Sequence, residues 1–177
     1  MDWNTVLTTS LIYSVVAVVL FSAILLGGVL TARDAMVQDY PPAIQERFGP
    51  KSPRGERVAR VLGVLMALLM LGIAIGGIAT LKDRLGGDIG FWPGFVFGKV
   101  LLIVINIFDL VVLDWLLFCW IQPSFMVLPG TEGMPEYRDW KFHLKVLVPR
   151  PVPWPLLFIP GYGLVVGGAT VVVEALQ

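Results

Sequence analysis

Two aspartates, Asp109 and Asp114, lie inside an otherwise apolar run, VLLIVINIFDLVVLDWLLFCWI, which extends from Val100 to Ile121. An ionised carboxylate at the centre of a bilayer costs at least about 2.5–3.5 kcal/mol on insertion scales. Acids at that depth bind protons or cations, or they pair with a polar group on a neighbouring helix. Asp109 and Asp114 are therefore the first functional candidates in this chain.

The spacing of the two acids limits how they cooperate in an α-helix. Five residues correspond to about 500° of rotation, so the carboxyl groups point about 140° apart with about 7.5 Å of rise between them. This geometry predicts that Asp109 and Asp114 do not share a proton on one face. Asn106, close to one turn before Asp109, is placed to hydrogen-bond to it.

Polar partners for these acids are few, because no Lys or Arg lies inside the apolar runs. Tyr162 is the candidate in the last run, since Pro160, Gly161 and Gly163 favour an open backbone around it. We expect Tyr162 or its adjacent backbone to lie near Asp109.

The elements that carry these residues follow from the composition. Hydrophobic residues make up 56% of the 177 residues and charged residues only 15%, whereas about 25% charged is typical of soluble domains. A chain of this length cannot hide so much apolar surface from water. The composition excludes a soluble enzyme, a disordered chain and a disulfide scaffold, and the net charge of zero argues against binding nucleic acid through bulk charge.

Four apolar runs are long enough to cross a bilayer, which takes about 20 residues of helix. We predict an all-α polytopic membrane protein, a four-transmembrane-helix bundle that forms one integral membrane domain over residues 1–177. The predicted spans cover residues 6–31, 60–81, 97–121 and 152–174, joined on one side by links 32–59 and 122–151.

The distribution of Lys and Arg predicts the orientation. Six lie from Arg33 to Arg60 and four from Arg138 to Arg150, against three between the second and third spans. Because positive charge gathers on the cytoplasmic side, the two longer links are expected there and both termini outside. We expect a multi-pass protein of a bacterial-type plasma membrane.

Four bases recur every three residues before the second span. They are Lys51, Arg54, Arg57 and Arg60. On a helix they share one side at the level of the lipid head groups, which fits binding of anionic lipid. The same pattern also fits an ordinary orientation signal.

The segment YRDWKFHLKVLV in the second link has two interpretations. Strict alternation predicts a strand, whereas a stripe of Tyr137, Trp140, Leu144 and Leu147 predicts a short interfacial helix. In either case the segment lies against head groups or docks a partner, and His143 is expected to be solvated or lipid-facing. The single Cys and single His indicate no metal site, and no motif indicates a cofactor.

Small residues spaced by four predict close helix contacts. The patterns are Gly72-x-x-x-Gly76 with Gly77, Gly163-x-x-x-Gly167 with Gly168, and Ala23-x-x-x-Gly27 with Gly28. They favour tight packing without distinguishing contacts within one chain from contacts between copies.

Two classes of function follow from the third-span acids. The first is proton- or cation-linked passage of a small solute through the membrane. The second is a non-catalytic accessory or assembly subunit of a larger membrane complex, in which the acids pair with a partner's helix. An enzyme is disfavoured, because no nucleophile, base cluster or phosphate loop gives catalytic geometry. The expected partners are the lipid bilayer and either further copies of the chain or a larger complex.

Overall fold

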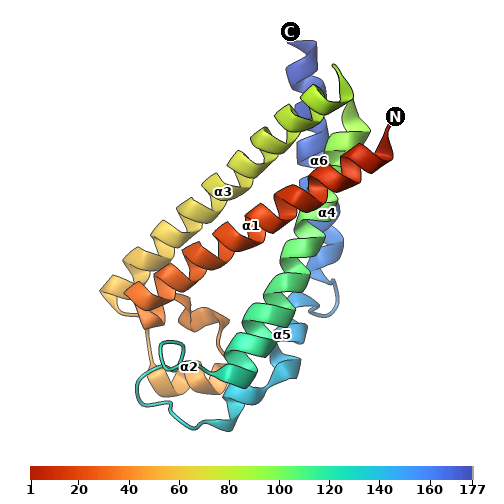
Figure 1. Cartoon of the computed structure of the whole chain (residues 1–177). Coiled ribbons are helices and arrows are strands. Elements are labelled where there is room, and N and C mark those ends of the chain that lie inside the picture. Colours follow the sequence, from red (N-terminus) through yellow and green to blue (C-terminus); the bar gives the residue numbers. More distant parts are fainter. Residues whose placement is uncertain (177) are drawn as a thin grey trace. The chain divides into compact units, whose positions relative to one another are not determined.

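The computed structural model describes residues 1–176, and helices dominate it (Figure 1). The chain is 80% helical, and the described residues contain no strand. Four helices are long and apolar enough to cross a membrane. They are α1 (Trp3–Thr31), α3 (Pro53–Leu85), α4 (Phe91–Phe108) with its continuation η2 (Asp109–Ile121), and α6 (Trp154–Ala175). The predicted all-α fold with four spans is confirmed.

Local sequence explains where two of these helices begin. The carboxylate of Asp2 accepts the N–H of Thr5, which satisfies a free donor in the first turn of α1. α3 begins at Pro53, earlier than the predicted span, because proline has no N–H to leave unpaired at the first position. The hydroxyl of Ser52 accepts the N–H of Gly55 and completes that helix start.

The chain divides into two compact units, and the first combines residues 1–20 and 68–107 with the stretch from Val148 onward. In this unit the Tyr13 hydroxyl donates to the Gly76 carbonyl at 2.9 Å and joins α1 to α3. The Glu174 carboxylate accepts the N–H of Ile89 at 2.8 Å and joins α6 to the loop before α4. Polar contacts therefore fix the helices of this unit at several points.

Glycines set the closest helix approach in the first unit. A Cβ added to Gly98 of α4 would lie 3.1 Å from the Cα of Gly163 in α6, and one on Gly94 would lie 3.1 Å from the Cα of Gly167. A Cβ on Gly77 would overlap the ring of Phe97. The contacts predicted for Gly77, Gly163 and Gly167 are thus present, with Gly94 and Gly98 as partners that no sequence pattern indicated, whereas a Cβ on Gly72 or Gly168 would meet nothing within 4 Å.

The second unit contains residues 21–67 and 108–147. Its two links fold into short helices, which are η1 (Arg33–Asp39), α2 (Pro42–Phe48), η3 (Pro135–Arg138) and α5 (Trp140–Leu147). The Tyr40 hydroxyl donates to the Met126 carbonyl at 2.7 Å, and the Tyr137 hydroxyl accepts the N–H of Leu128 at 2.9 Å. These buried groups belong to one apolar core, so the two links form a single folded region.

The helical interpretation of the second link is the one observed. Trp140–Leu147 is an α-helix, and the Asp139 carboxylate accepts the N–H groups of Lys141 and Phe142 at its start, each at 3.1 Å. Capping by Asp139 favours a helix over the strand that the alternating pattern also allowed.

Candidate functional site

The third span changes its hydrogen bonding at Asp109. α4 ends at Phe108, and the chain continues to Ile121 as a π-helix, with the N–H of Gln122 donating to the carbonyl of Leu117 at 2.9 Å. Bonding between residues five apart places such residues roughly above one another. Most π-helical segments are single turns, frequently found at functional sites, whereas this one continues for 13 residues.

As a result, Asp109 and Asp114 line the same recess, whose volume is about 300 Å³. The expectation that they point about 140° apart is wrong, because it assumed 3.6 residues per turn throughout the span. The recess belongs to the second unit. Its lining comes from α1, α3, η1, η2, α5 and the links, and consists of Phe21, Leu25, Val29, Met36, Asp39, Tyr40, Met66, Asp109, Leu113, Asp114, Phe118, Met126, His143 and Val146.

His143 is the partner of Asp114. Its Nδ1 lies 3.2 Å from Asp114 Oδ1, and its side chain is only 6% exposed. The expectation of a solvated or lipid-facing His143 is therefore wrong. On a helix this residue falls beside Trp140 and Leu147 of the apolar stripe, which is the signal that could have indicated its burial.

Neighbouring aromatic groups fix the position of His143. The ring of Phe118 in η2 lies 4.9 Å from the imidazole, centroid to centroid. The indole N–H of Trp115 donates to the Trp140 carbonyl at 3.2 Å and ties α5 to η2. The Nε2 atom of His143 is buried and has no hydrogen-bond partner among the described residues. The hydrogen-bonding capacity of this nitrogen is therefore unsatisfied.

Asp39 is a third acid in the recess, and no pattern in the sequence indicated it. Asp39 is an exposed residue, but it lines a concave recess in which neighbouring protein atoms exclude part of the water. Burial raises the pKa of Asp39 above its usual value, the nearby Asp114 carboxylate adds to this rise, and Lys51 and His143 oppose it. No periodic pattern indicates such a residue, because a link and not a span carries it.

Asn106 and Tyr162 have other partners. The Asn106 amide donates to the Leu102 carbonyl at 2.7 Å, within its own helix. The Tyr162 hydroxyl donates to the Met70 carbonyl at 2.8 Å and joins α6 to α3 within the first unit. The expected approach of Tyr162 to Asp109 stays a prediction.

The four bases before the second span separate into different environments. Arg54 and Arg57 line a groove between α1 and α3. Lys51 lines a second, smaller recess, which shares Asp39 with the recess of Asp109 and Asp114. Arg60 is exposed and donates to the carbonyl of Glu56. In the described part of the chain, no Lys or Arg lies within 4.0 Å of a carboxylate of Asp39, Asp109 or Asp114.

The chemistry available in the recess is therefore binding of positive charge. Three carboxylates and one imidazole face it, and the rest of the lining is apolar apart from the Tyr40 hydroxyl. Residues 1–176 contain no group of three or more His, Cys, Asp or Glu side chains arranged to hold a metal ion. The chain matches no family model, and no curated protein or solved structure is similar to it.

Proposed function

We propose that this protein mediates proton- or cation-linked passage of a small solute across a membrane, with the third-span carboxylates as the binding groups. The observation that carries the proposal is that Asp109 and Asp114 face one recess together with Asp39 and His143. Charge in an apolar helix is unfavourable unless it is neutralised. Since no Lys or Arg of residues 1–176 lies within 4.0 Å of these carboxylates, a proton or a small cation is the simplest neutralising partner.

The Asp114–His143 pair provides a route for protons. A carboxylate accepts hydrogen bonds, so the pairing assigns the hydrogen to Nδ1 of His143 and leaves Nε2 of the neutral ring as an acceptor. A proton taken up at Nε2 gives an imidazolium that Asp114 stabilises at 3.2 Å. Asp109, closer to the middle of the span, is the next acid along the same helix.

A flux measurement on the purified chain tests the proposal. The protein is reconstituted into liposomes that contain a pH-sensitive dye, and an imposed pH gradient drives proton movement with sodium or potassium present. We expect Asp109→Asn and Asp114→Asn each to reduce the flux strongly, since the amide keeps the shape of the side chain but neither ionises nor carries a proton.

The control is Asp83→Asn, which changes an exposed acid at the end of α3 outside the recess. We expect this variant to retain wild-type flux. If Asp109→Asn and Asp114→Asn also retain it while remaining folded, the transport proposal is wrong. Loss of a co-purifying membrane protein in those two variants, with no flux in any sample, supports the accessory-subunit alternative instead.

A further inference from the structure

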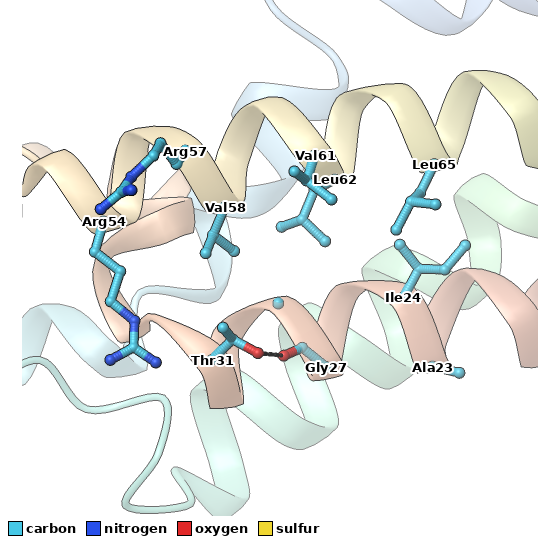
Figure 2. A pocket seen from close by; sticks show the side chains of 11 residues that line it. Ala23, Ile24, Gly27, Thr31, Arg54, Arg57, Val58, Val61, Leu62 and Leu65 are labelled. Carbon is cyan, nitrogen blue, oxygen red and sulfur yellow. Dashed lines mark hydrogen bonds between the residues drawn. The ribbon is translucent and has the colours of Figure 1, made fainter.

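A groove of about 670 Å³ lies between α1 and α3 in the second unit, separate from the acidic recess (Figure 2). Two glycines of α1 shape it. Gly28 is pressed against the side chain of Leu62, where an added Cβ would lie 2.5 Å from Leu62 Cδ1. Gly27 meets nothing within 4 Å. One glycine thus brings the helices together, and its neighbour leaves the groove open.

The groove has a charged end and an apolar length. Arg54 and Arg57 stand at the start of α3, and Figure 2 shows the Arg54 side chain extending toward the end of α1, near Thr31. Farther along both helices the walls are apolar, formed by Ala23, Ile24, Val58, Val61, Leu62 and Leu65. A molecule that fits has a negative head and a hydrocarbon body.

The two arginines are not neutralised by the protein. Within residues 1–176 no carboxylate lies within 4.0 Å of the guanidinium group of Arg54 or Arg57. Arg57 uses its Nε to donate to the Pro53 carbonyl at 3.3 Å, and both side chains are exposed. Arginine binds phosphate oxygens through several parallel N–H donors, so the remaining donors suit a phosphodiester.

We propose that this groove binds one anionic phospholipid, with the phosphate at Arg54 and Arg57 and an acyl chain against the apolar walls. The occupant is a lipid because the groove lies along two helices that are long and apolar enough to span a membrane, where lipid is the surrounding solvent. Basic residues at the end of a span attract anionic head groups. The proposal uses none of the recess residues and does not depend on the proposed transport.

Native mass spectrometry of the full chain in detergent tests the proposal by counting bound lipid during titration. The probes are dioleoyl phosphatidylglycerol and the zwitterionic dioleoyl phosphatidylcholine. We expect one phosphatidylglycerol to bind in preference to phosphatidylcholine. Arg54→Gln with Arg57→Gln should weaken its binding about thirtyfold, since each base near an anionic surface contributes about fivefold.

Two further variants separate the groove from general surface charge. Arg60→Gln with Arg138→Gln removes the same charge from exposed positions outside the groove and should leave binding unchanged. Gly27→Leu fills the groove without altering charge and should reduce binding by at least tenfold. The side chain enters open space, so the variant is expected to fold.

Three results would overturn the proposal. One is an equal loss of binding in the Arg54/Arg57 and Arg60/Arg138 double variants, which indicates bulk electrostatics. Another is wild-type binding by Gly27→Leu. The third is displacement of the lipid by glycerol 3-phosphate at comparable concentration, which indicates a site for the phosphate alone.

Discussion

His143 stabilises one of the two acids of the third span, Asp114. Its imidazole is the one basic side chain within 4.0 Å of an acid of the recess in the described residues, and it reaches Asp114 from α5. The pair is only partly buried on the Asp114 side, where 29% of the side chain is exposed. A single histidine therefore gives Asp114 a partner, whereas Asp109 has no ion pair among the described residues.

Asp39 supports a prediction about pH. Burial, with the Asp114 carboxylate adding to it, raises its pKa in the folded protein above the usual 3.8. The folded state then holds a proton that the unfolded chain releases, so stability falls as the pH rises from about 4 through the raised pKa. We expect Asp39→Asn to remove this loss, and its melting temperature should exceed that of the wild type increasingly as the pH rises.

The measurement is thermal unfolding in detergent, followed by tryptophan fluorescence at several pH values. Asp83→Asn is the matched control, because it makes the same change on an exposed face. A difference between Asp39→Asn and wild type that stays constant over the whole pH range contradicts the assigned environment of Asp39.

The third span combines two helical geometries, and each has its own role. The α-helical part, Phe91–Phe108, packs through glycines against α6 in the first unit. The π-helical part, Asp109–Ile121, directs its acids into the recess of the second unit. The change of period at Asp109 is therefore what brings residues five apart to one surface.

The glycine packing of α4 against α6 leads to a prediction about stability. Gly98→Val places new carbon atoms where a Cβ alone would lie 3.1 Å from the Gly163 Cα and 3.2 Å from the Tyr162 carbonyl oxygen. We expect a loss of about 1–3 kcal/mol, typical of overpacking, visible as a lower melting temperature. Gly168→Ala is the control, because its Cβ meets nothing within 4 Å; if both variants melt alike, the close approach is not present.

Across the whole chain, the sequence is sufficient to predict the four apolar helices and the acids in the third. Helix length and hydropathy are local properties, and the bilayer requires every spanning backbone group to be paired within its own helix. The recess could not be predicted in this way, because it depends on contacts between the two links. One of them is the hydrogen bond from Tyr40 to Met126, which joins residues 86 positions apart. No periodic pattern contains that contact, so Asp39 and His143 could not be placed beside Asp114 from the sequence.

The π-helical geometry was not predictable for a related reason. A helical wheel assumes a fixed rotation per residue, and the residues from Asp109 to Ile121 carry no signal that distinguishes the two helix types. The error affected only the relative directions of Asp109 and Asp114. Their depth in a membrane stays a prediction from sequence position.

The orientation of the molecule is a prediction that labelling can check. Because the longer links carry ten of the thirteen Lys and Arg residues, we expect them inside and both termini outside. With Cys119→Ala as background, a membrane-impermeant maleimide applied to intact cells should label Asn4→Cys and spare Glu132→Cys until the cells are opened. Labelling of Glu132→Cys alone in intact cells contradicts this orientation.

We expect Asp114 and His143 to act as one proton-binding unit in the recess. A double-mutant cycle on proton flux tests it most directly, with Asp114→Asn, His143→Gln and the combined variant reconstituted side by side. Groups that act as a unit are strongly non-additive, so we predict that the combined variant loses no more flux than the more impaired single variant. Losses that multiply, or wild-type flux in all three variants, would contradict the claim.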